Sequence, residues 1–323
     1  MYGLLDGDIV LFRCGFAAER TRWHLAYDPM FEYAPDGEAR LFQGEFREHE
    51  DFEFKREATD RLDEVCPGIK SRVEGEDYKL WPEVQLEPLE YALQNVRTLV
   101  SRLCSECDIS EFELKVAFSD KKTFRHTLAK TRPYKGSRKD SRRPTYEKEI
   151  KAYMKENYDC YTAENEEADD LLGIWATEYG PHGAVIISLD KDLDQIPGLK
   201  YNWLHDVHYD ITEETGLYNF FTQLLMGDTT DDIVGLPGIG KGKAAKALHA
   251  RGGWQEMFDE ACLQYQVHSG EEDWYEYMVE MAQLVWIRRY EDEDIREKLD
   301  ELYVNTGDNN DMFEVSELTL EVD

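Results

Sequence analysis

Nine acidic residues in this chain stand where they could bind metal ions together. Three of them follow short apolar runs at residues 2–5, 114–119 and 184–189. Such runs, separated by helical stretches, predict buried parallel strands. Ligands bind beyond the carboxyl ends of such strands, so we expect acids placed there to converge. The full candidate set is Asp6, Asp120, Glu167, Asp169, Asp170, Asp190, Asp192, Asp228 and Asp231.

Carboxylates gathered in one cleft must either become protonated or bind cations. Ligation by oxygen atoms alone selects hard ions, which makes Mg²⁺ or Mn²⁺ the expected metal. Two such ions roughly 4 Å apart can activate a water and stabilise the leaving oxygen of a phosphodiester. The acids at 167–170 also have a simpler explanation, because the helix dipole favours negative charge at the start of the helix predicted for residues 168–179.

Other kinds of catalytic site find little support in the sequence. The eight histidines show no metal-ligand spacing, and no Ser/His/Asp or Cys/His arrangement is evident. Cys104 and Cys107 form a lone CxxC pair, whereas a zinc site needs further ligands. The six cysteines are scattered, which fits a reducing cytoplasm, and the first residues show no basic secretory signal.

The charge of the chain is extreme and unevenly distributed. With 69 acidic and 37 basic residues the net charge is −32, which opposes binding to a polyanion. Residues 121–143 run against this trend, because they hold ten Lys or Arg and one acid. Cations there could neutralise phosphates, and Phe124 and Tyr134 could stack on bases. A solvated basic loop, or a partner for the acidic tail, is the alternative.

A glycine-rich turn follows the last acids of the set. Residues 235–241 match the spacing of a phosphate-binding P-loop, but the next residue is Gly242 where Ser or Thr is needed. A helix–hairpin–helix type of turn fits better, since its backbone N–H groups grip a phosphate without reading sequence. A purely structural turn is the alternative.

The remaining pattern predicts the elements that must position these residues. Apolar spacing predicts helices over 86–107, 145–157 and 168–179, and a largely helical region from 218 to 290. Residues 28–82 are acidic and are read as an insertion with a hairpin around 40–54. Residues 291–323 carry thirteen acids and two bases, which predicts a solvated, partly disordered tail.

In combination, six short motifs resemble the 5′-nuclease superfamily, which includes bacteriophage 5′–3′ exonucleases, flap endonucleases and the nuclease domain of DNA polymerase I. They occur in the family's order and span residues 1 to about 250. The motifs are Leu-Leu-Asp6-Gly-Asp, Phe-Ser-Asp120 with Phe-Arg125, Tyr-Lys135-Gly-Ser-Arg138, Glu167-Ala-Asp-Asp170, Ser-Leu-Asp190-Lys-Asp192, and Gly-Asp228-Thr-Thr-Asp231 running on to Gly-Ile-Gly-Lys241.

The resemblance implies an α/β fold with a PIN-like, Rossmann-like parallel sheet flanked by helices. It adds a helical arch at about 121–150 and a helix–three-turn–helix element. The implied domains are a catalytic domain over 1–210 that carries the acidic insertion, a DNA-binding region over 211–290, and the tail over 291–323.

The resemblance also implies roles for single residues. One metal would be bound by Asp120, Glu167, Asp169 and Asp170, with Asp6 nearby. Asp8 is an alternative candidate for the role of Asp6. The other metal would be bound by Asp190, Asp192, Asp228 and Asp231. Lys135 and Arg138, with Asp170, are the implied catalytic residues. The implied DNA contacts are Arg125, Tyr134, Lys135, Arg138, Gly238, Gly240, Lys241 and Lys243, with K⁺ on the carbonyls of the glycine turn.

Together these features predict a two-metal 5′–3′ exonuclease or 5′ flap endonuclease that leaves 5′-phosphates. The expected substrate is DNA with a 5′ end, a flap or a single-stranded arm, or an RNA–DNA hybrid, in phage-type replication or primer removal in the host cytoplasm. A non-catalytic DNA-structure-binding protein and a PIN-type ribonuclease are the alternatives.

Overall fold

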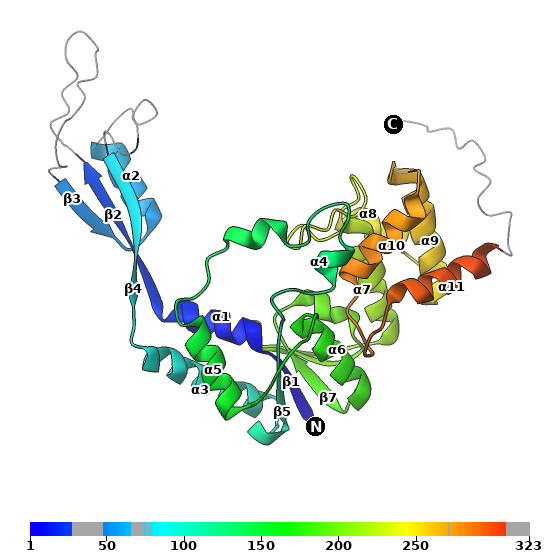
Figure 1. The fold of residues 1–323 in the computed structure, drawn as a ribbon, viewed down its shortest axis with the longest axis horizontal. Coiled ribbons are helices and arrows are strands. Elements are labelled where there is room, and N and C mark those ends of the chain that lie inside the picture. The colour runs from blue at the N-terminus through cyan, green and yellow to red at the C-terminus, as the bar shows by residue number, and fades with distance from the viewer. Residues whose placement is uncertain (28–47, 66–73, 75–77, 271, 308–323) are drawn as a thin grey trace, which may run out of the picture. The chain divides into compact units, whose positions relative to one another are not determined.

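The computed structural model describes residues 1–27, 48–65, 74, 78–270 and 272–307 (Figure 1). Contacts divide the chain into two compact units. Unit 1 comprises residues 1–11, 97–143 and 151–323, and unit 2 comprises residues 12–96 and 144–150. Three of the four unit boundaries fall within α1 (Gly7–Ala17), α3 (Leu89–Glu106) and α5 (Glu147–Asn157), and the fourth lies just before α5. The predicted division into domains over 1–210, 211–290 and 291–323 does not follow these boundaries and stays a prediction.

Unit 1 is built on a six-stranded sheet with the order β6-β5-β1-β7-β8-β9. All neighbours run parallel except β8 and β9, which are antiparallel. The three strands predicted from apolar runs are its centre, and the predicted parallel α/β fold is confirmed. The strands are β1 (Tyr2–Asp6), β5 (Leu114–Phe118), β6 (Asp159–Thr162), β7 (Ala184–Ile187), β8 (Gly198–Asn202) and β9 (Val207–Ile211).

Helix α6 (Ala168–Tyr179) has the predicted bounds and packs on one face of this sheet. Leu172 and Trp175 of α6 lie in one buried cluster with Leu4 of β1 and Ile186 of β7. Gly173 lets α6 also approach the segment that follows α10 (Trp274–Val285), since a Cβ there would lie 2.3 Å from the carbonyl oxygen of Arg288. The sheet therefore fixes the position of the acids at the start of α6.

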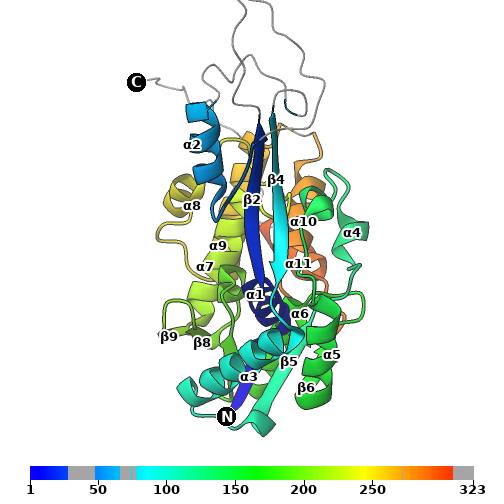
Figure 2. The same ribbon diagram turned by 90° about the vertical axis from the view of Figure 1, so that its left-hand side faces the viewer.

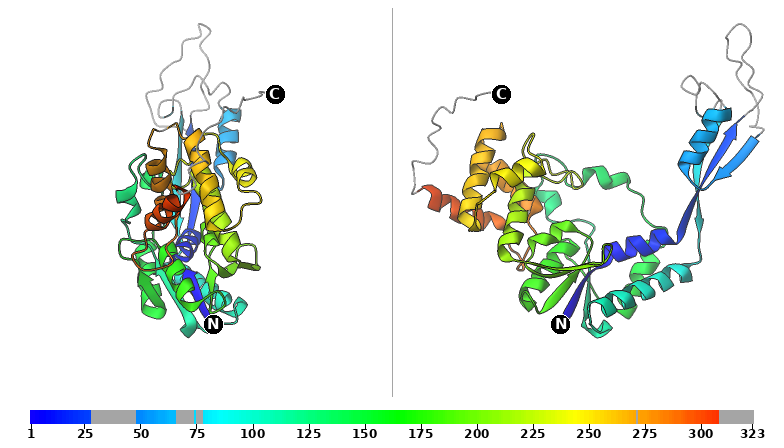
Figure 3. Two further views of the ribbon diagram at one scale, coloured as in Figure 1. Left: turned by 90° about the vertical axis from the view of Figure 1, so that its right-hand side faces the viewer. Right: turned by 180° about the vertical axis from the view of Figure 1, so that it is seen from behind.

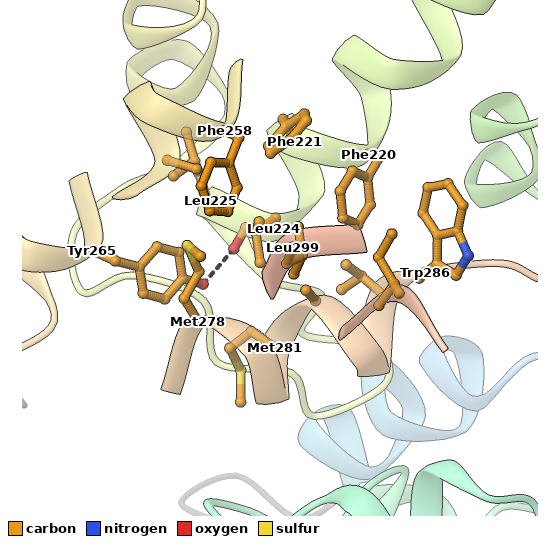
Figure 4. Close-up of a cluster of buried hydrophobic side chains, with 14 of the residues drawn as sticks. Phe220, Phe221, Leu224, Leu225, Phe258, Tyr265, Met278, Met281, Trp286 and Leu299 are labelled. Atoms are coloured by element: carbon orange, nitrogen blue, oxygen red, sulfur yellow. Dashed lines mark hydrogen bonds between the residues drawn. The ribbon is translucent and has the colours of Figure 1, made fainter. Parts of the chain in front are cut away.

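The second core of unit 1 is helical (Figure 4). Phe220, Phe221 and Leu224 pack against Phe258 and other buried side chains of the neighbouring helices. Figure 3 shows these helices gathered at one end of unit 1. They are α7 (Glu213–Met226), α8 (Lys241–Ala247), α9 (Gly253–His268), α10 (Trp274–Val285) and α11 (Ile295–Gly307).

Helix α7 is closed at both ends by specific contacts. Its first turn is capped by Thr212, whose side chain accepts a hydrogen bond from the N–H of Thr215. At its other end the Tyr265 hydroxyl donates to the carbonyl oxygen of Leu224 at 2.7 Å. Carbonyls in the last turn of a helix lack partners within the helix, so Tyr265 satisfies a group that would otherwise be buried alone.

Unit 2 contains a three-stranded antiparallel sheet with the order β3-β2-β4. Its strands are β2 (Glu19–Tyr27), β3 (Glu48–Phe52) and β4 (Tyr78–Leu86), and β2 and β4 run side by side in Figure 2. Leu25 and Tyr27 pack against Leu62 of α2 (Lys55–Val65) on one face. On the other face the rings of His24, His49 and Trp81 stack at 5.2–5.5 Å.

Several expectations need correction in the described residues. The predicted tail contains α11, so residues 295–307 are helical rather than disordered. The predicted arch holds α4 (Arg125–Leu128), a 3₁₀ turn at Gly136–Asp140 and the start of α5, without a long helix. Of the hairpin expected at 40–54, residues 40–47 lie outside the described residues, as does the tail beyond 307. None of the described helices is long and apolar enough to span a membrane.

Removal of the Tyr265 hydroxyl should destabilise the helical core of unit 1. We expect Tyr265→Phe to lower the free energy of unfolding by about 1–3 kcal/mol, because the carbonyl of Leu224 is left without a donor. Urea unfolding followed by circular dichroism measures this. Tyr290→Phe is the matched control, since Tyr290 is 63% exposed. Equal stability of the two variants would contradict the role given to Tyr265.

Candidate active site

The acids that follow β1 and β7 are joined through one serine. Asp6 is the last residue of β1, and its Oδ1 accepts hydrogen bonds from the N–H groups of Asp8 and Ile9 at 3.1 and 3.2 Å. The Ser188 hydroxyl donates to Asp6 Oδ2 at 3.3 Å and accepts from the N–H of Asp190 at 3.1 Å. The parallel pairing of β1 with β7 thus brings Asp6 and Asp190 together, as predicted.

Asp169, from the first turn of α6, joins the same group of carboxylates. Burial, together with repulsion from Asp8 and Asp190, raises the pKa of Asp6 to about 7. Burial raises the pKa of Asp169 well above its usual range, and the charges of Asp190 and Asp6 add to this effect. Three acids from distant parts of the chain therefore repel one another at one place.

Asp192 and Asp228 continue this group. Burial and repulsion from Asp190 and Asp228 raise the pKa of Asp192 to about 7. Asp228 is 6% exposed, and its Oδ1 accepts a hydrogen bond from the N–H of Thr230 at 2.7 Å. A donor set made only of carboxylate oxygens suits a hard divalent cation. Even so, in the described part of the chain no three His, Cys, Asp or Glu side chains already form a group that could hold a metal ion.

Asp170 differs from its neighbours because it is fully buried against Arg125. The guanidinium donates to both carboxylate oxygens of Asp170, at 2.6 and 2.8 Å. The N–H groups of Glu167 and Arg288 donate to the same carboxylate at 3.1 and 3.2 Å. Although burial would raise the pKa of Asp170, Arg125 outweighs it and holds that pKa below its usual value.

These contacts change the roles predicted for two residues. The oxygens of Asp170 are already taken by four donors, so in this structure the residue fixes the start of α6 and is not free to bind a metal. Arg125 is 2% exposed and also donates to the carbonyls of Leu284 and Trp286, so it does not present its charge to DNA. The net charge of the segment gave no sign that this arginine is buried.

Two further acids near β5 are held by backbone donors. Asp120 accepts hydrogen bonds from the N–H groups of Lys121 and Asn165, at 2.6 and 3.0 Å, and these lower its pKa. Asp8 accepts from the N–H of Ser119 at 2.9 Å. Both side chains thus tie loops to the strand end, whereas Asp6 is linked to Asp190 through Ser188.

Glu167 and Asp231 are paired with side chains of the basic segment. Lys135 Nζ lies 2.6 Å from Glu167 Oε1 and 3.4 Å from Asp231 Oδ2. The Tyr134 hydroxyl lies 2.9 and 3.1 Å from the same two carboxylates, and its ring is 5% exposed. Arg138 pairs with Asp231. The structure thus brings Lys135 and Arg138 to the acids, as expected, whereas Tyr134 is buried and not open to a base.

The glycine turn lies farther along the chain, between α7 and α8. Gly238 has a φ of +72°, and Gly240 precedes the first residue of α8. Both glycines are exposed, and a Cβ at either would meet nothing within 4 Å. Lys241 and Lys243 are exposed in α8. The turn is open to a ligand, and its role in binding DNA stays a prediction.

Some residues that shape this site were not identified from the sequence. Ser188 links two of the acids, and its place one residue before Leu189-Asp190 is a usable signal, because it follows the strand directly. Arg288 pairs with Glu166 and lies over the ring of Phe124, with its Cζ 4.0 Å from the centroid. Arg288 is more than 100 residues away from both Glu166 and Phe124 along the chain, so no local sequence pattern indicates these contacts.

Parts of this chain are similar to known proteins. No family model matches the chain. An exodeoxyribonuclease of Enterobacteria phage T3 is 33% identical over 131 residues, which are 39% of this chain and 43% of that protein. An exonuclease of Escherichia phage T7 is 31% identical over 131 residues, which are 39% of this chain and 43% of that protein. The flap endonuclease Xni of Colwellia psychrerythraea is 29% identical over 33% of this chain and 41% of its own length.

The resemblance to 5′ nucleases is confirmed. The chain spans less than half the length of these curated relatives, so the likeness concerns a segment of each. Among solved structures, a 5′-exonuclease of bacteriophage T5 is 16% identical, with a TM-score of 0.48 over 67% of this chain and 91% of that one.

The ion pair of Arg125 and Asp170 should be essential for stability. We expect Arg125→Met to lower the free energy of unfolding by about 3–5 kcal/mol, because the charge of Asp170 is left buried without a partner. Urea unfolding of the full chain measures this. Arg56→Met is the control, since Arg56 and its partner Asp60 are 90% and 66% exposed and the pair should contribute at most about 1 kcal/mol. Similar losses in the two variants would contradict the assignment.

Proposed function

We propose that this chain is a divalent-metal-dependent 5′ nuclease that hydrolyses DNA phosphodiesters and leaves 5′-phosphates. The observation that carries the proposal is the convergence of carboxylates at one edge of the sheet, where Ser188 links Asp6 of β1 to Asp190, three residues beyond β7, and where Asp169 of α6 faces both. Such a group costs stability unless cations neutralise it. The relatives of this chain include proteins named exodeoxyribonuclease, exonuclease and flap endonuclease.

The metal ligands in this proposal are Asp6, Asp169, Asp190, Asp192 and Asp228. Glu167 and Asp231 complete the set when Lys135 does not occupy them. When bound, two Mg²⁺ or Mn²⁺ ions would activate a water and stabilise the leaving oxygen. Asp170 and Asp120 are left out, because backbone and guanidinium donors already bind their oxygens.

The chain's own cations hold the substrate. Lys135 and Arg138 stand beside the acids and could bind the phosphate to be cleaved, and so stabilise the charge that develops there. The exposed turn at Gly238–Lys243 would hold duplex DNA through backbone N–H groups and two lysines, with K⁺ on its carbonyls. The expected substrates are 5′ ends, flaps and RNA–DNA hybrids, in phage-type DNA replication or primer removal in the host cytoplasm.

Loss of one acid should remove cleavage and spare binding. We expect Asp190→Asn to lower the rate of cleavage of a 5′-labelled flap substrate in Mg²⁺ by about 10²–10³-fold, since charge stabilisation at the reacting phosphate is lost. Affinity for the same DNA, measured in Ca²⁺, should change little. Asp210→Asn is the control, because Asp210 is exposed on β9.

Normal cleavage by Asp190→Asn would refute the metal assignment. A panel of duplex, flap, RNA and RNA–DNA hybrid decides the substrate. Cleavage of RNA alone would favour the ribonuclease, and binding of flaps without cleavage would favour a DNA-structure-binding protein.

Binding to DNA should weaken steeply with salt, because most of this acidic surface repels DNA. We expect Lys241→Met to weaken binding to every duplex sequence equally and to lower the slope of log Kd against log salt by about 1. Fluorescence anisotropy in Ca²⁺ at several salt concentrations measures this. Lys298→Met is the control, since Lys298 pairs with Glu301 on α11. An unchanged slope in Lys241→Met would exclude the turn as a phosphate site.

A further inference from the structure

One ammonium group lies between the two sets of acids that the family resemblance assigns to two metals. Glu167 belongs to one set and Asp231 to the other, and Lys135 Nζ contacts both, at 2.6 and 3.4 Å. Glu167 directly precedes α6, and Asp231 lies in the turn after α7. A single side chain therefore neutralises one acid from each set.

The rest of the basic loop, defined here as residues 132–138, is held on the same turn. The N–H of Lys135 donates to the carbonyl of Asp231 at 3.0 Å, and the N–H of Ser137 donates to Asp232 Oδ2 at 2.8 Å. Arg138 pairs with Asp231, and Arg132 lies 3.3 Å from Asp232. The basic loop is thus docked on residues 230–232 by charge as well as by backbone hydrogen bonds.

Docking holds Lys135 in an unfavourable backbone conformation. Its φ is +51°, in the left-handed region that a lysine rarely adopts, and it is followed by Gly136. Such a conformation persists only where surrounding contacts impose it. Release of the loop would relieve this strain, so the docked state depends on the carboxylates it neutralises.

The loop can leave without disrupting a core. The side chains of Arg132, Lys135 and Arg138 are 58%, 22% and 44% exposed, so water can replace their contacts. Tyr134 differs, since it is buried within the helical core cluster and its ring meets that of His126 edge-on at 5.4 Å. Tyr134 is therefore the anchor, and residues 135–138 form the part that moves.

We propose that Lys135 is the internal counter-ion of the site without metal, and that a divalent cation binding Glu167 and Asp231 displaces it and releases residues 135–138. This inference rests on the proposed function, because it assumes that these acids bind metal. Two cations cannot occupy the same carboxylate oxygens at close range, since like charges repel. By linkage, the factor by which loop docking weakens metal binding equals the factor by which metal weakens docking.

The released loop has a use in the proposed reaction. Docked, Lys135 and Arg138 are neutralised by acids and have little charge to offer a phosphate. Undocked, both become free cations next to the loaded metal site. Metal binding would then free Lys135 and Arg138 to bind a DNA phosphate. The phosphate would therefore be held only at a site that already contains metal.

Metal affinity without DNA tests the competition directly. Electron paramagnetic resonance of free Mn²⁺ gives the Kd for the full-length wild type, Lys135→Met and Lys246→Met. We expect Lys135→Met to bind Mn²⁺ at least about tenfold more tightly, because the competing ammonium is absent. Lys246→Met removes the same charge from an exposed position of α8 and should match the wild type. Equal or weaker Mn²⁺ binding by Lys135→Met would overturn the proposal.

Loop release is measured separately by limited trypsin digestion of the wild type with and without Mn²⁺. We expect cleavage after Lys135 and Arg138 to accelerate several-fold with Mn²⁺, even though the metal raises the Tm of the whole chain. Unchanged or slower cleavage at these sites would overturn the release. Absence of Mn²⁺ binding by every variant would overturn the metal assignment as well, whereas equal binding by all three would overturn only the displacement of Lys135.

Discussion

Carboxylates crowded at the end of a parallel sheet are the constraint on which the rest of unit 1 depends. The pairing of β1 with β5 and β7 places Asp6 near the acids that follow its neighbours, where burial strengthens their repulsion. Two features of the fold reduce this repulsion. Arg125 neutralises Asp170, and Lys135 pairs with Glu167 and Asp231. In the proposed function the remaining acids bind cations, so Asp170, which has a structural role, directly follows a proposed metal ligand, Asp169.

The difference between these two neighbours follows from helix geometry. Successive residues in the first turn of α6 point in directions about 100° apart. Asp170 turns toward Arg125 and the N–H of Arg288, and Asp169 toward Asp6 and Asp190. A motif of three acids in four residues thus combines a structural ion pair with a carboxylate that faces the other acids.

Much of the fold and of the candidate site could be predicted from the sequence. The apolar runs at 2–5, 114–119 and 184–189 predicted the centre of the sheet, because a strand buried on both faces is apolar throughout. The spacing at 168–179 predicted α6, because a helix buried on one face has apolar residues every three or four positions. The sequence did not reveal β8 and β9, whose pairing depends on a short antiparallel connection, or the sheet of unit 2, whose strands are rich in charge. Nor did it reveal that Arg125 and Tyr134 are buried. Composition treats each basic residue as exposed, whereas the burial of Arg125 depends on Asp170 and the carbonyl of Leu284, which lie 45 and 159 residues away.

The central strand of unit 1 also has a consequence for how the chain is made. Gly3 pairs with Leu114 on one side and with Val185 on the other, so β1 is synthesised well before either of the strands it pairs with. Pairings between such distant residues form slowly, because the entropy cost of closing a long loop comes before any stabilising contact is made. Until β7 has been synthesised, one edge of β1 has no partner strand, and the nascent chain must keep that edge from pairing elsewhere.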